Sequence, residues 1–353
     1  MMSSSFLPDW ALVMAGGSGE RMHASGVRVP KPLVPVLGVT LLERNVHALL
    51  RWGFGNIIIA TPAGCAEIRR FVEQRLTPLV KAGGGELVCF VEDRPMGNIG
   101  CASAFGERTR HLLVVYADNL TVLDLSRIYE RHKEAGADMT IATHRQPFRM
   151  PFGEVRTDSG RVTAYVEKPV YYHEVCSAVS VLGPKAMKAI PQDRPTGLSA
   201  LVQEMIHAGN DVRAFPHTAP WTDVNDAFAL RQAEQLIRDH QSAFDVWLSD
   251  RHEARTLICE SACGRVRLPK QAGGFRHMAE SSAVTTQPFI AFDDFDEDTS
   301  RLMRFHVAAR RREHAEESDG SWWNLDAALE DDSVSRIARR ALALMAPFLE
   351  ANQ

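Results

Sequence analysis

Three features that would assign a chain to whole classes of protein are missing from this sequence. No apolar run reaches about 18 residues, the length that a membrane-spanning helix needs. Residues 1–10 are polar and lack the apolar stretch of a signal peptide. The 44 acidic residues outnumber the 40 basic ones and give a formal net charge of −4, whereas nucleic-acid binders usually carry a basic surplus. We therefore predict a cytoplasmic protein that binds neither nucleic acid nor a membrane.

Cysteine is scarce and scattered along the chain. The last two cysteines lie close together, but no second pair or histidine cluster accompanies them to complete a zinc site. Reduced and buried thiols, several of them within apolar runs, are the expected state in a cytosolic protein. Internal repeats are also absent, and the lack of a hexapeptide period argues against a C-terminal β-helix. The six cysteines are Cys65, Cys89, Cys101, Cys176, Cys259 and Cys263.

What the sequence does contain is enough apolar material for a folded α/β protein. Hydrophobic residues make up 45% of the 353 positions, which can offset the entropy lost on folding. In the first 240 residues, short apolar runs alternate with stretches of helical period. This order predicts a Rossmann-like, mostly parallel mixed sheet flanked by helices. The expected strands are 11–14, 56–60, 86–91 and 111–116, and the expected helices between them are 41–52 and 66–80.

The pattern changes after residue 137, where the strand candidates become short. Two of them flank the turn 157–160, Thr-Asp-Ser-Gly, which is typical of a hairpin. We expect a mixed or antiparallel lobe added to the parallel sheet. Further on, we expect a helix over 198–207, a strand over 212–215 and one long helix over 225–248 that closes the domain. The short strand candidates are 139–142, 153–155, 161–166 and 178–181.

Residues 249–353 match no pattern that indicates a role. We expect them to form a smaller C-terminal α+β region beside a main domain at 1–248, serving oligomerisation, regulation or a second active site. The amphipathic segment 333–349 predicts a helix with Ser333 or Ser335 as its N-cap. The acidic run 292–298 and the basic run 310–312 are expected on the solvated surface.

Glycines follow the first expected strand directly. Glycine lets the backbone turn tightly and aim its N–H groups at phosphate oxygens. The segment is not a P-loop, because no Gly-Lys-Ser/Thr follows, and Met22 breaks a dinucleotide fingerprint. Prolines on both sides stiffen the backbone at Lys31, and a rigid lysine with a nearby arginine, Arg21, can neutralise a triphosphate. The candidate nucleotide-binding residues of the loop are Ala15, Gly16, Gly17, Ser18 and Gly19.

The order of these residues resembles the opening signature of the sugar-1-phosphate nucleotidyltransferases, also called nucleotide-sugar pyrophosphorylases. That signature is Gly-Gly-x-Gly-x-Arg followed by Pro-Lys-Pro, and here it stands at 16–21 and 30–32. The resemblance covers about residues 10–240 and implies a GT-A-like fold with a nucleotidyltransferase catalytic domain at 1–248. It also implies that Arg21 and Lys31 stabilise a departing pyrophosphate. The implied partners are an NTP and a phosphorylated sugar or sugar-like acceptor, with homo-oligomerisation left open.

Two later motifs of that family carry carboxylates. The segment 116–118, Tyr-Ala-Asp, follows the fourth strand, and the segment 221–225 is similar to the family's Trp-x-Asp-Ile-Gly. The resemblance implies that Asp118 and Asp223 bind a divalent cation, and an all-oxygen site suits Mg²⁺. Asn225 stands where the family has glycine, and Asp118 has the alternative role of capping a helix near residue 123.

The acceptor side is implied by three further matches. The segment 166–169 contains the family's Glu-Lys-Pro, which implies that Glu167 holds sugar hydroxyls and that Lys168 contacts the acceptor phosphate. Gly153 lies in a strand similar to the family's Tyr-Gly-Val-Val, whose glycine borders the sugar. Ser177 lies in the segment that takes the place of Asn-Ala-Gly-Ile-Tyr. Asn and Gly are both replaced there, which indicates an unusual acceptor.

The segment 95–100 resembles the family's Pro-Leu-Gly-Thr-Ala-Gly, which lies against the nucleobase and here includes Gly97. A carboxylate at Glu92 can accept hydrogen bonds from guanine N1–H and N2–H₂, which favours a purine, although a solvated Glu92 is an equal alternative. The implied reaction is NMP transfer from an NTP to a sugar 1-phosphate or a cyclitol phosphate, releasing pyrophosphate and forming an NDP-sugar. Two alternatives stay open: a cytidylyltransferase for a small alcohol phosphate or phosphonate, and a non-catalytic regulatory protein that binds nucleotide sugars.

Overall fold

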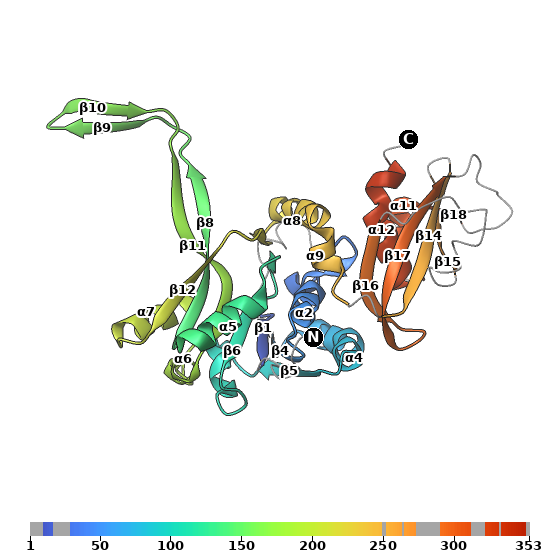
Figure 1. The fold of residues 1–353 in the computed structure, drawn as a ribbon, viewed down its shortest axis with the longest axis horizontal. Coiled ribbons are helices and arrows are strands. Elements are labelled where there is room, and N and C mark those ends of the chain that lie inside the picture. The colour runs from blue at the N-terminus through green and yellow to red at the C-terminus, as the bar shows by residue number, and fades with distance from the viewer. Residues whose placement is uncertain are drawn as a thin grey trace.

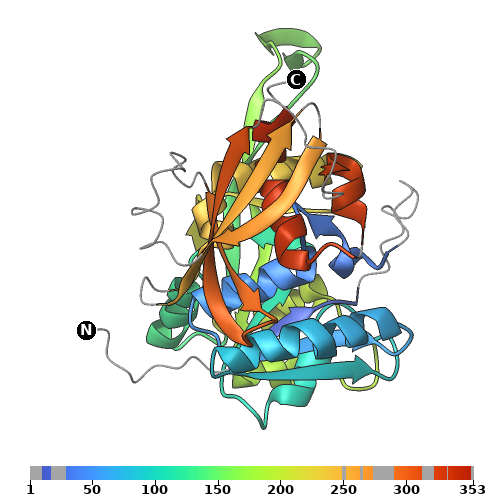
Figure 2. The same ribbon diagram turned by 90° about the vertical axis from the view of Figure 1, so that its right-hand side faces the viewer.

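The fold has two large sheets, each packed against helices, together with small two-stranded ribbons and a long two-stranded arm (Figures 1 and 2). No helix within the described ranges is long and apolar enough to cross a membrane. The computed structural model describes residues 10–16, 29–248, 252–262, 265–272, 290–311, 322–331 and 333–350.

The first sheet has seven strands in the order β12-β8-β11-β6-β1-β4-β5. Strand β11 runs antiparallel to both of its neighbours and the other pairs are parallel, so the predicted mostly parallel mixed sheet is confirmed. The four strands expected in the first half are present, and β1 is completely buried at Ala11, Leu12 and Val13. The strands are β1 (Ala11–Met14), β4 (Asn56–Pro62), β5 (Glu86–Glu92), β6 (Leu112–Tyr116), β8 (Met139–Arg149), β11 (Val170–Leu182) and β12 (Val212–His217).

Helices cover both faces of this sheet, and each face has its own apolar core. Leu49 of α2, Leu79 of α4 and Ile128 of α5 pack on one face, and Leu201 of α7 packs on the other. The helices are α2 (Leu41–Arg51), α3 (Ala66–Phe71), α4 (Thr77–Ala82), α5 (Leu125–Ala135), α6 (Pro184–Ala189), α7 (Leu198–His207), α8 (Ala227–Asp239) and α9 (Gln241–Asp245), with a 3₁₀ segment η3 (Gly100–Phe105).

One expected helix is wrong. The segment 225–248 forms two helices, α8 and α9, because the backbone leaves the helical conformation at His240 (φ −126°, ψ 36°). The turn carries Asp245 into a fully buried position, where its carboxylate meets two arginines. Helical periodicity continues through this break in the sequence and therefore does not reveal it.

Strands β8 and β11 are longer than the sequence predicted, because they remain paired beyond the sheet as an arm. The arm ends in the hairpin of β9 (Glu154–Asp158) and β10 (Arg161–Val166), which reaches away from the rest of the chain in Figure 1. Its turn contains Ser159 (φ 46°) and Gly160 (φ 82°), the two positive φ angles that a tight hairpin requires. The predicted hairpin is therefore confirmed.

The C-terminal part forms a five-stranded sheet in the order β16-β17-β14-β15-β18, which faces the viewer in Figure 2. Helix α12 packs on this sheet, and Ser335, one of the two predicted caps, accepts a hydrogen bond from the Ala338 N–H. The elements are β14 (Ala254–Ala262), β15 (Arg265–Ala272), β16 (Ile290–Asp296), β17 (Arg301–Arg311), β18 (Trp322–Asn324), α11 (Leu325–Glu330) and α12 (Arg336–Glu350).

The expectation that the acidic run 292–298 is solvated is confirmed for Glu297 and Asp298, which are exposed, and wrong for the three aspartates before them. Asp293 and Asp294 are fully buried and Asp296 is 4% exposed, because arginine side chains pair with each of these carboxylates. The side chains of the basic run 310–312 lie outside the described residues. The expected free thiols are found at Cys65, Cys89, Cys101, Cys176 and Cys259, whereas Cys263 lies outside the described residues. Burial is confirmed for Cys101 and Cys259 and wrong for the other three, of which Cys176 is exposed.

Candidate active site

A cavity of about 600 Å³ opens where β1, β4, β5 and β6 end. In open α/β sheets, ligands bind at the carboxyl ends of the strands. Five of the residues predicted from the sequence line this cavity: Gly16, Lys31, Glu92, Gly97 and Asp118. Ala15 lies directly beside it and donates its backbone N–H to the Ala60 carbonyl. The cavity therefore joins the glycine turn, the Pro-Lys-Pro segment and the first metal-ligand candidate.

Lys31 connects both predicted metal ligands. It begins the 3₁₀ turn η1 (Lys31–Leu33), its side chain is 8% exposed, and its Nζ lies 2.5 Å from Asp118 Oδ2. The same Nζ donates to Asn225 Oδ1, and Asn225 Nδ2 donates to Asp223 Oδ2. Four side chains from three distant parts of the sequence thus form one chain of polar contacts.

Two short strands hold the aspartates near each other. Strand β7 (Asn119–Thr121) begins directly after Asp118 and pairs antiparallel with β13 (Trp221–Asp223). The register sets Asp223 opposite Asn119, and the Val224 N–H donates to the Asp118 carbonyl. Asp118 does not cap the following helix, because Asp124 does so for α5. Its carboxylate therefore remains available to the cavity.

The donor set fits a hard divalent cation. Asp118 Oδ2 and Asn225 Oδ1 both accept hydrogen bonds from the Lys31 ammonium group. The two oxygens therefore point toward the same position, which holds a positive charge. Asp223 contributes a further carboxylate through its contact with Asn225. Carboxylate and amide oxygens are ligands that Mg²⁺ and Ca²⁺ accept. Asn225, where the family has glycine, thus takes part in this polar arrangement.

Gly97 shapes one wall of the cavity. Its φ is 83°, and a Cβ at this position would overlap the backbone of Thr196. Hydrogen bonds fix this close approach, because Thr196 N donates to Met96 O (2.9 Å) and Ile99 N donates to Thr196 O (3.3 Å). Only glycine combines this φ with this proximity.

Glu92 ends β5 and is buried in the same wall. It is 8% exposed, and its Oε1 has no hydrogen-bond partner among the described residues. Burial raises the pKa of this carboxyl group above its usual value. The solvated alternative for Glu92 is therefore wrong, and an orphaned acceptor at a cavity wall is suited to a ligand's N–H groups.

Tyr116 is a cavity residue that the sequence analysis did not single out. It ends β6, lines the cavity, and its hydroxyl is buried without a partner among the described residues. Burial raises the pKa of the Tyr116 phenol, and the nearby Cys176 and Asp118 raise it further. Its place two residues before Asp118 was the available signal. A neutral hydroxyl here can bind a ligand oxygen.

A second, more open groove lies beside Asp223. It has a volume of about 580 Å³ and connects Asp223 with the base of the arm. Apolar and amide side chains share its lining, as is common for sites that bind hydroxylated ligands. The lining residues are Gln146, Phe148, Val175, Cys176, Trp221, Thr222, Asp223, Gln232 and Leu236.

Three of the predicted acceptor residues lie on the arm and line neither cavity nor groove. Glu167 and Lys168 follow β10, and their side chains are 62% and 58% exposed. Tyr165 Oη donates to Glu167 Oε2 (3.0 Å) and lies so close to Gly153 that a Cβ there would overlap it. Lys168 has a positive φ of 44° before a proline, a conformation that is rare and strained for this residue. Their acceptor roles stay predictions.

Ser177 lies in a bulge of β11, between the arm and the sheet. The bulge shifts the register with β8 between Cys176 and Ser180, and Ala178 has a φ of 58°, at the place of the family's glycine. Asn119 Nδ2 donates to the Ser177 carbonyl (2.8 Å), and the buried Ser177 hydroxyl lies 2.7 Å from His217 Nε2. Ser177 therefore faces His217 and not the groove.

The remaining predicted residues, Gly17, Ser18, Gly19 and Arg21, lie in 17–28, outside the described residues. Their roles stay predictions.

Comparison with known proteins gives relatives that are named as sugar-1-phosphate guanylyl- or uridylyltransferases. A mannose-1-phosphate guanyltransferase beta-B of Xenopus laevis is 24% identical over 222 residues, covering 61% of this chain and 60% of that protein. A D-glycero-alpha-D-manno-heptose 1-phosphate guanylyltransferase of Aneurinibacillus thermoaerophilus is 27% identical over 160 residues, covering 45% of this chain and 67% of that protein. This chain thus spans about 60% of the length of the Xenopus relative.

Solved structures share the fold. HddC from Yersinia pseudotuberculosis, complexed with GMP-PN, has a TM-score of 0.50 and 20% identity, over 65% of this chain and 99% of that one. A Bacillus anthracis protein in complex with a sucrose has a TM-score of 0.52 and 17% identity, over 66% and 96%. A family model described as Nucleotidyl transferase matches residues 10–240. Since this match spans well over half of the sequence, the chain belongs to the nucleotidyl transferase family.

Proposed function

We propose that this protein transfers NMP from a nucleoside triphosphate to a sugar 1-phosphate, releasing pyrophosphate and forming an NDP-sugar. The observation that carries the proposal is the contact of Lys31 with Asp118 and Asn225, which extends to Asp223, beside a cavity of about 600 Å³. Family membership and the guanylyltransferase relatives support it. The cavity takes the nucleotide, and the groove beside Asp223 takes the acceptor.

Asp118 and Asp223, with Asn225, would hold a magnesium ion. Bound there, the ion supplies positive charge that offsets the phosphate oxygens. The side chains of this chain supply the rest: Lys31 adds a buried positive charge at the cavity, and the two short strands fix the two aspartates relative to each other. Positioning and charge neutralisation are the main contributions to phosphoryl and nucleotidyl transfer.

The reaction balances without a general base. An oxygen of the sugar phosphate forms a bond to the α-phosphorus of the NTP, and the bond from that phosphorus to pyrophosphate breaks. The second pKa of a phosphate monoester is about 6, so the attacking group is mostly ionised at neutral pH. We therefore assign no side chain to proton removal.

Glu92 selects the base in this proposal. Its buried Oε1 lacks a partner and can accept from guanine N1–H and N2–H₂, whereas adenine offers no donor at N1. A site that contains an unpaired buried polar group discriminates strongly against ligands that leave it unpaired. The two relatives named as guanylyl- or guanyltransferases support GTP as the donor.

The first test measures pyrophosphate release from four NTPs, each with magnesium and with mannose 1-phosphate, a heptose 1-phosphate, an inositol phosphate or no acceptor. We expect release that requires a sugar 1-phosphate and is fastest with GTP. Preference for CTP with a non-sugar phosphate would replace this proposal by the cytidylyltransferase alternative. Nucleotide binding without release would replace it by the regulatory one.

Removal of the Lys31 charge tests the site itself. In Lys31→Met we expect kcat/KM to fall by at least about 10²-fold, because charge stabilisation in a desolvated site is worth several kcal/mol. The matched control is Lys185→Met, since this side chain is 68% exposed and bonds only to Asp138 among the described contacts. Equal activity of both variants would contradict the assignment.

A further inference from the structure

The C-terminal sheet contacts the segment that follows Lys31. After η1 the chain forms a small ribbon of β2 (Pro35–Val36) and β3 (Val39–Thr40), with Leu37 and Gly38 at its turn. Leu37 packs against the apolar core of the C-terminal sheet. A Cβ at Gly38 would lie 3.1 Å from Arg340 Cα of α12, which is tighter than side chains normally pack. Helix α12 therefore rests directly on this ribbon.

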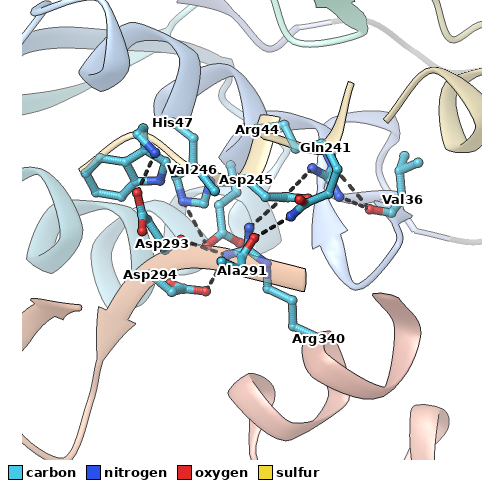
Figure 3. A network of polar contacts seen from close by, with 12 residues as sticks. Val36, Arg44, His47, Gln241, Asp245, Val246, Ala291, Asp293, Asp294 and Arg340 are labelled. Carbon is cyan, nitrogen blue, oxygen red and sulfur yellow. Dashed lines mark hydrogen bonds and ion pairs between the residues drawn. The ribbon is translucent and has the colours of Figure 1, made fainter. Parts of the chain in front are cut away.

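A buried polar network ties the same ribbon to α12 (Figure 3). Val36 O accepts from Arg44 Nε (3.2 Å) and Nη2 (2.6 Å), and Arg44 Nη1 donates to Asp245 Oδ1 (3.0 Å). Arg340 Nη2 donates to the same carboxylate oxygen at 2.7 Å. All three charged side chains are fully buried. Asp245 thus bridges α2 of the first part and α12 of the second.

A neighbouring set of charges makes a second connection. Asp294 of β16 pairs with Arg336 (2.8 Å), Arg340 (2.7 Å) and Arg75, and Arg75 also pairs with Glu43 of α2 (2.6 Å). Although burial opposes ionisation, these arginines hold the pKa of Asp294 well below its usual value. His47 lies near Glu43 and Asp294, but the three arginines already supply the positive charge there, so we do not assign a metal site.

Helix α2 also connects this network to the strand end that carries Asp118. Asn45 is one residue from Arg44 and donates its Nδ2 to the carbonyl of Ala117 at 3.2 Å. Ala117 directly precedes Asp118. The helix that is bonded to the C-terminal sheet therefore also fixes the strand end that carries the first metal-ligand candidate.

We propose that Asp245 and Arg340 are positioning residues, through which the C-terminal sheet sets the place of Lys31 relative to Asp118. The inference rests on the proposed function for its kinetic consequence only. Arg340 does not touch the cavity lining; it acts through Asp245 and Arg44 on the Val36 carbonyl, five residues after Lys31. In this proposal, residues 254–350 help to set the geometry of the active site.

The test uses full-length variants that disturb the connection from its two sides. Arg340→Met removes the bridge to Asp245. Gly38→Ala inserts a methyl group against the α12 backbone and also strains the turn of the ribbon, where Gly38 has a φ of 75°, while all charges stay. The control is Arg301→Met, because Arg301 is an exposed residue of the same sheet that pairs with Glu253. Arg340→Lys, which keeps the charge, serves as the conservative variant.

The readout that does not depend on activity is the labelling rate of Lys31. We expect its buried amino group to react slowly with an acylating reagent, whereas the exposed Lys185 reports on general reactivity in the same digest. We expect labelling of Lys31 to rise severalfold in Arg340→Met and Gly38→Ala, with Lys185 unchanged, and to stay at the wild-type rate in Arg301→Met. Wild-type labelling in folded Arg340→Met and Gly38→Ala would overturn the proposal.

The kinetic readout adds the functional consequence. We expect kcat to fall by about 10- to 100-fold in both disturbing variants, because small displacements of positioned charges are costly, while the KM for the acceptor changes little. Arg340→Lys should recover part of kcat. If Arg340→Met does not fold, the labelling rate of Lys31 and the kcat of Gly38→Ala and Arg340→Lys test the proposal. If the wild type shows no transfer at all, the proposed function fails, and the labelling result still decides the positioning role.

Discussion

Ala178 combines a left-handed backbone with a side chain that disfavours it. Its φ of 58° occurs in the bulge of β11, and Asn119 holds this bulge by bonding to the carbonyls of Ser177 and Ala178. An L-residue pays roughly 1–2 kcal/mol for this conformation, while glycine adopts it freely. Since the bulge lies directly beside the Asp118 strand end, it is a local strain at the candidate active site.

We expect Ala178→Gly to raise the free energy of unfolding by about 0.5–1 kcal/mol, the relieved strain minus the greater chain entropy of glycine. Urea unfolding measures the change. Ala200→Gly, at an exposed position of α7, is the matched control and should be destabilising. A destabilised Ala178→Gly variant would show that the alanine methyl group contributes more than the strain costs.

The pKa of His47 predicts in which direction the free energy of unfolding changes with pH. It is fully buried, and burial, with Arg340 and Arg75 nearby, lowers its pKa from 6.5 to about 3 despite the carboxylates of Glu43 and Asp294. Between these two pH values the unfolded chain binds a proton at this position and the folded chain does not. The free energy of unfolding therefore falls as the pH drops below 6.5, by about 1.4 kcal/mol per unit for this residue.

In His47→Leu we expect the loss of stability between pH 7.5 and pH 5 to be about 2 kcal/mol smaller than in the wild type. Urea unfolding at both pH values gives the two differences. His207→Leu, which replaces an exposed histidine at the end of α7, is the matched control. An equal pH dependence in His47→Leu and the wild type would contradict a neutral, buried His47.

At the residue scale, the sequence indicated the site better than its surroundings. Lys31, Asp118 and Glu92 line the cavity because each follows a strand or motif whose place in an α/β sheet is fixed by topology. The burial of Asp293 and Asp294 was not predictable, because charge in a sequence does not reveal which arginines will surround it. These partners, Arg304, Arg336 and Arg340 among them, come from other elements.

At the scale of elements, the hairpin at the end of the arm depends on close packing between the segment before β9 and strand β10. Gly153 precedes β9 and faces the ring of Tyr165 in β10, whose hydroxyl holds Glu167. We expect Gly153→Ala to displace this ring and Glu167 with it. If Glu167 binds the acceptor as predicted, the KM for the sugar 1-phosphate will rise by about tenfold, the value of one lost hydrogen bond to a charged group.

Steady-state kinetics at varied acceptor and varied NTP separates the two substrates. The KM for the NTP should not change in Gly153→Ala, because Gly153 does not line the nucleotide cavity. Gly160→Ala, in the hairpin turn where a Cβ meets open space, is the control for a general disturbance of the arm. An unchanged acceptor KM in Gly153→Ala would remove Glu167 and Gly153 from the acceptor site.

The presence of most helices and strands could be predicted from the sequence, but their lengths could not. Helix α7 spans 198–207 as expected, since its apolar period ends where the chain turns. Strands β8 and β11 extend to 149 and from 170, because they bond to each other and not because their residues alternate in polarity. The break between α8 and α9 likewise follows from the partners of Asp245, which the local sequence does not contain.

At the scale of the whole molecule, buried charged groups connect the two sheets in addition to apolar contacts, in which Phe295 and Leu302 pack against the core of the first part. Removing one member of a buried ion network leaves its partners uncompensated, which costs about 3–5 kcal/mol. We therefore expect Asp245→Asn to lower the free energy of unfolding of the full chain by this amount, since Arg44 and Arg340 would lose their shared carboxylate. Urea unfolding measures the change.

Glu253→Gln provides the comparison, because it removes a carboxylate from an exposed pair with Arg301. Exposed pairs contribute little, so its effect should stay within about 1 kcal/mol. A similarly small effect of Asp245→Asn would show that the network contributes little to the attachment of the C-terminal sheet.

The docking of this sheet on α2 was not predictable, because residues 249–353 matched no known pattern and the acidic run of β16 was expected in solvent.

The buried network also sets an order of events during synthesis. Arg44 and Asp245 leave the ribosome well before Arg336 and Arg340, yet the carboxylates and guanidinium groups of both parts neutralise one another only when all are present. Until α12 has emerged, Arg44 of α2 and Asp245 of α9 lack the partner that Arg340 supplies. We therefore expect the growing polypeptide to be open to proteases and chaperone capture up to this late point, and to reach its final fold only then.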